Sequence, residues 1–405
     1  MKKLIRITTV PISLDKLLTG QMCFMNNYYE VTAISSQLEF LERCANNEKV
    51  KYFHLEMTRK ITPIKDVIAL LKLIRFLIKE KPLMVHSHTP KAGILAMLAS
   101  KIAQVPIRLH TVAGMPLAES NGVKRKMLEI IEKLTYYCAT KVYPNSKGLY
   151  DFILENKFTN KQKMKFIGNG SSNGINTSYF SPDSVSEETK LELKKELLIT
   201  NDDFVYVFVG RLVGDKGINE LIQAFIKIQK NNYNLKLLLV GSQEKDLDPL
   251  KDSTLLEIKS NKNIISVGFK QDVRPYLSVS NALVFPSYRE GFPNVVMQAG
   301  AMGLPSIVTD INGCNEIIED GINGILIPTK SSAAVEIAMK KLLNDKPYLI
   351  KLKMISREMI TSRYEQKVIW ESLLNEYKNL ETNWLIQSKK SIQNSKEEVF
   401  QPAFG

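Results

Sequence analysis

Short apolar runs alternate with amphipathic stretches along most of the chain. In the first half the runs lie near residues 4–10, 31–35, 50–55, 83–86, 107–112, 140–143 and 164–167, and in the second half near 204–209, 235–240, 263–267, 282–285, 306–308 and 323–327. Such runs predict buried strands, and the stretches between them, in which apolar residues recur every three to four positions, predict helices. Because strands that alternate with helices favour parallel sheets covered on both faces, the sequence predicts an α/β protein.

The two series of strands are separated by a segment of different composition. After Ile175 the chain is rich in Ser, Asp and Glu (SPDSVSEETK), and 405 residues are too many for one hydrophobic core. We expect a Rossmann-like domain over residues 1–180, a linker over 181–200 and a second Rossmann-like domain over 201–363, followed by a helix over 364–384. Residues 385–405 are polar and without a period, so we expect them to be disordered.

The segment Glu290–Pro305 (EGFPNVVMQAGAMGLP) combines a carboxylate, a tight turn and a helix start. It follows the apolar run 282–285, which predicts a strand that ends at the carboxyl edge of a sheet, and helical spacing resumes at Asn294. The first turn of that helix offers free backbone N–H groups and a positive dipole end, which favour an anionic diphosphate. Glu290 would accept hydrogen bonds from sugar hydroxyls, and Gln298 lies about two turns further along. A strand, turn and helix that only pack, with Glu290 in solvent, explain this segment equally well.

A second loop of the same kind lies upstream. The apolar run 204–209 is followed by Gly210–Gly217 (GRLVGDKG), in which Arg211 and Lys216 stand between glycines, and then by an amphipathic helix. Two fixed cations over the same carboxyl edge would neutralise phosphate charge, whereas either cation alone is typical of a solvated surface. The two loops together favour a phosphate-binding site.

These two segments, GRLVGDKGINELIQAF and PSYREGFPNVVMQAGAMGLPSIVTDINGCNEIIEDGINGILIP, resemble the C-terminal domain of retaining, metal-independent glycosyltransferases of the GT-B fold. The resemblance is to the family-four type, which includes bacterial capsule and O-antigen transferases. Three N-terminal segments, 58–66, 85–93 and 168–174, resemble the subgroup that assembles surface polysaccharides, and the likeness covers residues 2–380. It implies two Rossmann-like domains that face each other across a cleft, and a last helix that crosses back to the first domain.

The resemblance also implies roles for particular residues. Glu290 would contact the donor sugar, and Arg211 and Lys216 would hold the diphosphate, so these three are the expected catalytic residues. A glycine in the first loop, Gly20, would let the backbone approach the phosphates. The further donor-binding residues expected from the motif are Phe292, Asn294, Val295 and Gln298. The donor is expected to be a UDP-linked sugar, with no metal and no separate cofactor.

The chain departs from the family pattern at two positions. The family has a second glutamate eight residues after the first, where this chain has Gln298; a carboxamide oxygen still accepts one hydrogen bond but carries no charge. Many relatives carry a histidine near the reacting carbon, where this chain has Ala113. His110 lies two residues earlier and is a candidate on the acceptor side, although we do not transfer that role to it.

Two further candidates for the acceptor side follow the apolar run near 83–86. His88 would orient a hydroxyl group or act as a base, and Lys91, at the start of a helix, would bind an acceptor phosphate at the helix N-terminus. A strand end with satisfied polar side chains is an equally good explanation for the histidines. The glycine-rich segment 168–174 would serve as a hinge or as an acceptor loop.

The charge of the chain is concentrated in its first half. Residues 1–180 contain 27 Lys and Arg against 13 Asp and Glu, and residues 181–405 contain 28 against 29. This excess favours contact with an anionic membrane surface or a lipid diphosphate, and a role in solubility alone is the alternative. No basic and aromatic motif accompanies the charge, so we do not expect nucleic acid as a partner.

Composition completes the expectation. No apolar run is long enough to span a bilayer, and the four cysteines have neither paired nor metal-type spacing, which favours a reducing cytosol. We therefore expect a cytoplasmic enzyme, peripheral at the inner face of the membrane, that moves a hexosyl or N-acetylhexosaminyl group to a lipid-diphosphate-linked glycan in surface polysaccharide synthesis. The alternatives are a sugar-nucleotide epimerase of the same fold and a catalytically weak scaffold subunit.

Overall fold

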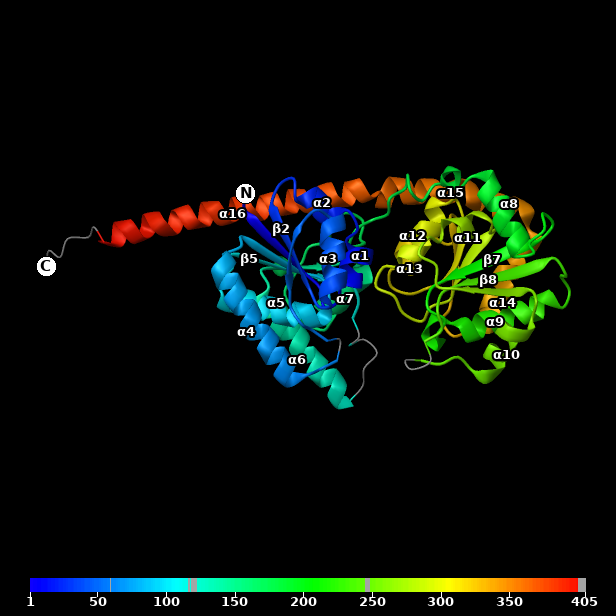
Figure 1. Ribbon diagram of the computed structural model, residues 1–405, viewed down its shortest axis with the longest axis horizontal. Coiled ribbons are helices and arrows are strands. Elements are labelled where there is room, and N and C mark those ends of the chain that lie inside the picture. The colour runs from blue at the N-terminus through cyan, green and yellow to red at the C-terminus, as the bar shows by residue number, and fades with distance from the viewer. Residues whose placement is uncertain (59, 116, 118–121, 245–247, 400–405) are drawn as a thin grey trace. The chain divides into compact units, whose positions relative to one another are not determined.

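The computed structural model describes residues 1–399, with the exception of residues 59, 116, 118–121 and 245–247 (Figure 1). The chain forms two compact units. Unit 1 contains residues 1–145 and 149–173 together with the C-terminal residues from Val368, and unit 2 contains residues 146–148 and 174–367. Each unit is built around a six-stranded sheet in which all strand pairs are parallel, as the alternating pattern predicts.

The sheet of unit 1 has the strand order β3-β2-β1-β4-β5-β6. Its strands are β1 (Lys3–Ile7), β2 (Glu30–Ser35), β3 (Lys51–His54), β4 (Met84–Ser87), β5 (Ile107–Val112) and β6 (Lys141–Pro144). The helices in this part of the chain are α1 (Pro11–Leu17), α2 (Gln21–Met25), α3 (Leu38–Asn47), α4 (Pro63–Glu80), α5 (Pro90–Ile102), α6 (Gly122–Cys138) and α7 (Lys147–Glu155).

Successive side chains of β1, in the middle of the sheet of unit 1, point to opposite faces of the sheet and belong to two separate hydrophobic cores. Ile5 and Ile7 of β1 belong to the core that contains residues of α4, α5 and α6, and Leu4 belongs to the core that contains residues of α1, α3 and the C-terminal helix. Arg6 shares the face of Leu4 because successive strand residues point to opposite faces. A guanidinium group is therefore completely buried in the second core.

The sheet of unit 2 has the order β12-β11-β10-β7-β8-β9. Its strands are β7 (Phe204–Val209), β8 (Leu235–Val240), β9 (Ile264–Gly268), β10 (Ala282–Phe285), β11 (Ser306–Thr309) and β12 (Gly324–Ile327). The helices are α8 (Glu187–Glu196), α9 (Ile218–Gln229), α10 (Asp252–Ser260), α11 (Arg274–Ser278), α12 (Asn294–Ala301), α13 (Cys314–Ile317), α14 (Ser332–Asn344) and α15 (Lys346–Tyr364).

Each sheet reverses its strand order once, between β1 and β4 in unit 1 and between β7 and β10 in unit 2. In open α/β sheets, ligands bind beyond the carboxyl ends of the strands at such a reversal. The topology therefore marks one place in each unit: the loops after β1 and β4, and the loops after β7 and β10.

One expectation about the middle of the chain is wrong. Residues 164–167 form no strand: Met164 makes a single isolated bridge with Val142, and the chain then turns through Gly168 and Gly170, whose φ angles are positive. Residues 181–200, expected as a linker and entry to a helix, do contain a helix, α8, and Leu193 of this helix is buried in the core of unit 2. The side chain of Ser186 caps this helix by accepting a hydrogen bond from the amide of Thr189.

The C-terminal helix is longer than the sequence analysis expects. Helix α16 (Gln366–Val399) continues through residues 385–399, where we expected disorder, since no proline or glycine interrupts it. From Val368 onwards its residues belong to unit 1. Residues 400–405 lie outside the described residues. In the part of the chain that the structure describes, no helix combines the length and the apolar character that crossing a bilayer requires.

Candidate functional site

The two loops at the reversal in unit 2 touch each other through opposite charges. Lys216 ends a short 3₁₀ helix after β7, and its Nζ lies 2.5 Å from Oε1 of Glu290, which follows β10. The same Nζ lies 3.4 Å from the hydroxyl of Ser287. Only 14% and 16% of the two charged side chains are exposed, so this is a sheltered ion pair. The predicted convergence of the two loops is confirmed.

Glycine is required where these loops meet. Gly217 has a φ of +70°, and a Cβ atom there would lie 2.1 Å from the carbonyl oxygen of Pro286. Asn312 donates from its side-chain amide to the carbonyl oxygens of Glu290 and Gly291, at 3.4 Å each. These contacts fix the backbone of the bend that carries the carboxylate.

The other cations of these loops also have acidic partners. Arg211 donates to Glu244 at 2.9 Å, and Arg289 donates to Asp215 at 2.8 Å. Arg211 is 42% exposed in its side chain, so its charge is accessible to an anion in solvent. Glu244, Asp215 and Asn312 were not predicted from the sequence, because neither an ion pair nor a side-chain hydrogen bond across loops leaves a periodic signal.

Helix α12 begins at Asn294, as the Gly-Phe-Pro turn predicts. Phe292 is 8% exposed and packs edge-on against Tyr364, with ring centroids 5.4 Å apart. Val295 packs against the core, and Gln298 is half-buried on the helix. The binding of a donor by Phe292, Asn294, Val295 and Gln298 stays a prediction.

Gly20 in unit 1 is held in a left-handed conformation, with a φ of +76°. A Cβ atom there would lie 2.7 Å from Cη2 of Trp370 on α16, and the Gly20 amide donates to Glu48 at 2.6 Å. Packing against an aromatic ring is thus one reason for glycine at this position. Its approach to phosphates stays a prediction.

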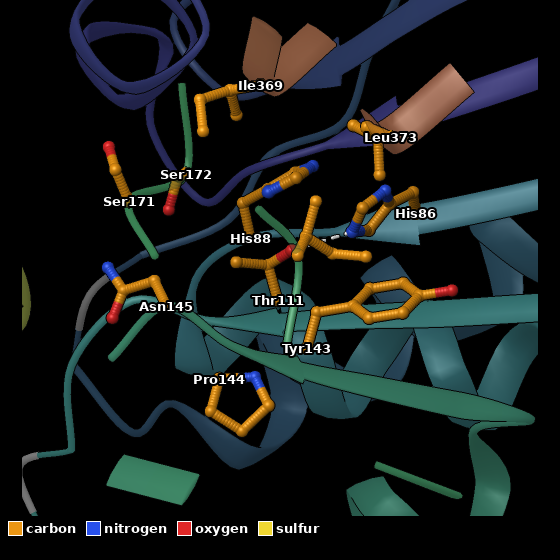
Figure 2. Close-up of a pocket in the computed structure, with 11 residues that line it drawn as sticks. His86, His88, Thr111, Tyr143, Pro144, Asn145, Ser171, Ser172, Ile369 and Leu373 are labelled. Carbon is orange, nitrogen blue, oxygen red and sulfur yellow. Dashed lines mark hydrogen bonds between the residues drawn. The ribbon is translucent and has the colours of Figure 1, made fainter. Parts of the chain in front are cut away.

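At the carboxyl ends of β4, β5 and β6 in unit 1 lies a cavity of about 20 Å³ (Figure 2). Figure 2 shows the rings of His86, His88 and Tyr143 together with Thr111 around it. The residues that line the cavity are His86, His88, Thr111, Tyr143, Pro144, Asn145, Ile167, Ser171, Ser172, Ile369 and Leu373. The last two residues come from α16, so the C-terminal helix closes one wall.

A chain of hydrogen bonds fixes the floor of this cavity. The Nδ1 atom of His86 lies 2.5 Å from the hydroxyl of Tyr377, and its Nε2 atom lies 2.7 Å from the hydroxyl of Thr111. Arg6 donates to Tyr377 at 3.0 Å and also to Gln21. Burial, followed by the charge of Arg6, holds the pKa of His86 well below its ordinary value, so this imidazole is neutral at pH 7.

His88, which was predicted from its place after a strand, does reach the cavity, and it is 3% exposed. Its ring lies against that of His86, with centroids 4.2 Å apart. Burial is also the main reason why the pKa of His88 lies well below its ordinary value. Among the residues 1–399 that the structure describes, neither ring nitrogen has a hydrogen-bond partner, and the same is true of Oδ1 of Asn145 and of the hydroxyl of Ser172.

The other two acceptor candidates are engaged elsewhere. Lys91 forms an ion pair with Asp66, and the first-turn amide of Ala92 already donates to the hydroxyl of Thr9. His110 is buried, with its Nδ1 atom 2.8 Å from the hydroxyl of Ser87, and it does not line the cavity. Their roles toward an acceptor stay predictions that this geometry does not support.

The described residues provide neither a cluster that could hold a metal ion nor evidence of an activated thiol. No group of three or more His, Cys, Asp or Glu residues there could hold a metal ion. All four cysteines are free, and burial raises the pKa of the Cys314 thiol well above its usual range. A thiol in this state is a poor nucleophile.

The chain is similar to known proteins along almost its whole length. The model of the family "Glycosyl transferases group 1" matches residues 189–359, and that of the "Glycosyl transferase 4-like domain" matches residues 28–170. The capsular polysaccharide biosynthesis glycosyltransferase CapM of Staphylococcus aureus is 34% identical over 93% of this chain and 97% of its own length.

A second relative and a solved structure agree with these matches. An Escherichia coli enzyme, UDP-Gal:alpha-D-GlcNAc-diphosphoundecaprenol alpha-1,3-galactosyltransferase, is 27% identical over 79% of this chain and 82% of its own length. The crystal structure of Anabaena HepE in complex with UDP-glucose is similar in fold, with a TM-score of 0.76 and 16% identity over 94% of this chain and 100% of that chain.

Proposed function

The chain belongs to the group 1 glycosyltransferase family with the GT-B fold, and we propose that it moves a sugar from a UDP-sugar to a lipid-diphosphate-linked glycan. That the protein is a glycosyltransferase confirms the resemblance seen in the sequence. Its place in surface polysaccharide synthesis is part of the proposal. The capsular enzyme CapM and the galactosyltransferase with a GlcNAc-diphosphoundecaprenol acceptor support it by their similarity.

The Lys216–Glu290 contact is the observation that carries the donor half of this proposal. A diphosphate needs cations and a transferred sugar needs a hydrogen-bond acceptor, and unit 2 gathers both at the one reversal of its sheet. In the proposed complex the Lys216 ammonium turns from Glu290 to the phosphates. Glu290 is then released to the sugar hydroxyls. Gly20 is retained as a further candidate for contact with the phosphates.

The proposed reaction proceeds with retention of configuration. The bond between the anomeric carbon and the phosphate oxygen breaks, and the acceptor oxygen forms its new bond on the same face. The departing phosphate oxygen takes the proton of the acceptor hydroxyl, so no enzyme nucleophile is needed. Lys216, Arg211 and the first-turn amides of α12 stabilise the charge that develops on the leaving diphosphate.

A transfer assay tests the proposal. The purified protein is incubated with a set of UDP-sugars and with short-chain prenyl-diphosphate monosaccharides, with EDTA present throughout, and products are followed by mass spectrometry. We expect one donor and acceptor pair to give a disaccharide with an α linkage. An altered donor without transfer would instead assign an epimerase, and binding of UDP without any product would assign a scaffold.

The exposed faces of α4 and α6 support a peripheral membrane contact. On α6 the residues Val123, Met127, Ile130, Leu134 and Tyr137 follow helical spacing and are all exposed, Val123 at 85%. On α4, Ile64 and Leu71 are 78% and 61% exposed. Both helices pack on α5 in unit 1, so these apolar stripes belong to one layer of helices.

Cations accompany both stripes. Lys72, Arg75 and Lys79 are exposed on α4, and Lys126 and Lys133 on α6. Apolar side chains flanked by lysine and arginine are the pattern by which amphipathic helices bind anionic bilayers. We therefore propose that this surface, which we call the α4–α6 face, rests on an anionic membrane that contains the lipid-linked acceptor.

Flotation with vesicles tests the α4–α6 face. We expect binding to phosphatidylglycerol vesicles but not to phosphatidylcholine vesicles, and an approximately ten-fold loss of binding in the double variant Leu71→Ser, Ile130→Ser. The control is Ile337→Ser, which removes a residue with 68% exposure from unit 2. A double variant that binds as tightly as the wild type, or that only converts a dimer to a monomer, would remove the membrane from the proposal.

A further inference from the structure

We propose that the cavity of unit 1 binds a neutral hydroxyl group of the acceptor sugar through His88, Asn145 and Ser172. The inference rests on the proposed function, because it takes the acceptor to be a glycan. It adds the part of the acceptor that is recognised, which is a sugar hydroxyl and not the lipid diphosphate.

Buried polar atoms without partners converge on this cavity. Both ring nitrogens of His88, Oδ1 of Asn145 and the hydroxyl of Ser172 are shielded from solvent and make no hydrogen bond with any residue that the structure describes. All three residues line the same cavity, although they come from three separate segments of unit 1. A buried polar group without a partner costs folding free energy, so several such groups at one cavity indicate a place kept for a polar ligand.

The kinds of polar atom decide what the ligand is. A neutral imidazole offers one donor and one acceptor, an amide oxygen accepts, and a serine hydroxyl does both. A hydroxyl group, which donates one hydrogen bond and accepts others, satisfies this set. A phosphate group, in contrast, only accepts, and the described residues that line the cavity include no lysine or arginine. The guanidinium group of Arg6 is already bonded to Tyr377 and Gln21.

The dimensions agree with a hydroxyl group. About 20 Å³ holds a group of the size of one water molecule and no phosphate. Ile167, Ile369 and Leu373 supply an apolar wall against which the C–H groups of a sugar ring can pack. A single hydroxyl at the edge of a sugar therefore fits the space and its walls.

The three residues are also held in place by their surroundings. The ring of His88 lies against that of His86 at a tilt of 34°, and the two nitrogens of His86 are fixed by Tyr377 and Thr111. The backbone carbonyl oxygen of Ser172 accepts a hydrogen bond from the side chain of Gln21 at 3.0 Å, and the backbone N–H of Asn145 donates to the carbonyl oxygen of Val112 at 3.0 Å. Such a preorganised site distinguishes a sugar that presents the hydroxyl from one that lacks it.

Nuclear magnetic resonance of the full-length protein with ¹⁵N-labelled histidine tests the inference directly. The chain has only four histidines, His54, His86, His88 and His110, so the ring signals are few enough to assign. The probes are short-chain prenyl diphosphates that carry N-acetylglucosamine, glucose or galactose. We expect one of them to shift the ring nitrogens of His88 while those of His54 and His110 stay unchanged.

Substitution tests the same contact without the histidine. We expect Ser172→Ala to weaken the affinity for that probe about ten-fold and to leave the affinity for UDP unchanged. A probe that lacks the bound hydroxyl should bind the wild type about ten-fold more weakly and Ser172→Ala with no further loss. The matched control is Ser100→Ala, because Ser100 also has a buried hydroxyl without a partner but does not line the cavity.

The outcomes separate this inference from the proposed function. Sugar transfer to a probe that leaves His88 unshifted and binds Ser172→Ala normally overturns the inference alone, and the cavity then holds only water. A shift of His88 by a sugar that is never glycosylated supports the inference and counts against the transferase activity. If no probe shifts His88, the inference is overturned whatever the transfer assay gives.

Discussion

The polar sites at the carboxyl edges of the two sheets carry opposite kinds of chemistry. In unit 2 the loops after β7 and β10 hold charged side chains, and Lys216, Arg211 and Arg289 each have an acidic partner. In unit 1 the cavity beyond β4 is lined by neutral groups, and three of its residues have polar atoms without a partner. The same topology thus supports a paired, charged site and an unpaired, neutral one.

This difference indicates how each site remains able to bind a ligand. A charge in a sheltered loop costs less when an opposite charge neutralises it, so the lysine of unit 2 is stored in an ion pair until a stronger anion replaces its partner. Neutral donors and acceptors around a small cavity cannot all form hydrogen bonds with one another, so some of them stay without a partner until a ligand binds. Salt should therefore weaken ligand binding at the first site and have little effect at the second.

The largest effect is expected from Glu290→Gln, which keeps the shape of the charged site and removes its negative charge. Glutamine accepts weaker hydrogen bonds from the sugar, while Lys216 remains free for the phosphates. We expect kcat to fall by about 100-fold or more and the Kd for UDP to change by less than about three-fold. Steady-state kinetics and calorimetry measure the two quantities. A variant with wild-type kcat would remove Glu290 from the site.

A smaller effect is expected from Lys216→Met, which breaks the ion pair from its other side. The affinity for UDP should fall about ten-fold or more at low salt, since one charge-assisted contact to phosphate is lost. Arg211→Met, which breaks the more exposed Arg211–Glu244 pair, should lower the affinity for UDP by a smaller factor. Calorimetric titration at two salt concentrations measures both. Equal affinity of Lys216→Met and wild type would contradict the comparison between the two sites.

The smallest effect is expected for the stability of the fold at acid pH. All four histidines lie in unit 1, so protonation of histidine should destabilise unit 1 and not unit 2. Burial lowers the pKa of His110 from its ordinary value of 6.5 to about 4. Between these values the unfolded chain binds more protons than the folded chain, so the free energy of unfolding falls as the pH falls through this window. The stability due to the neutral ring is fully present above pH 6.5.

His110→Asn isolates this contribution. From pH 7 to pH 5 the wild type should lose about 2 kcal/mol more of its unfolding free energy than the variant, at roughly 1.4 kcal/mol per pH unit below 6.5. Urea unfolding followed by tryptophan fluorescence measures it in the right place, since Trp370 and Trp384 both lie in unit 1. Parallel losses in both proteins would show that His110 is not buried as the structure has it.

Much of the fold follows from the sequence because local pattern and tertiary environment agree there. Apolar runs such as 204–209 and 282–285 are buried strands, and the turn before Asn294 starts a helix where expected. The prediction at 164–167 failed because an apolar stretch forms a strand only if a neighbour continues the ladder, and here only Met164 pairs. Pattern alone cannot show the absence of that neighbour.

The sites were predicted unevenly for a related reason. Lys216, Glu290 and His88 lie in the loops that follow apolar runs, so their place at a sheet edge can be read from the sequence. Asn145 also follows an apolar run and Ser172 lies in the glycine-rich segment 168–174, but the sequence pattern does not single them out, because their importance arises from polar atoms that find no partner among the described residues once the chain has folded. The charged Arg6 within the apolar strand KLIRI was the one available hint that a buried polar network crosses unit 1.

Helix α16 has a practical consequence for anyone who divides this protein. Tyr377 bonds to Arg6 and His86, and Leu373 and Leu374 fill the second core of unit 1, although all three stand more than 190 residues after the rest of that unit. A fragment that stops at residue 173 would keep every strand of its sheet yet leave a guanidinium group and an apolar groove open to water. Adding residues 366–399 as a separate peptide should restore the folded state of this fragment. The fragment and the peptide would then serve together as a split-protein reporter.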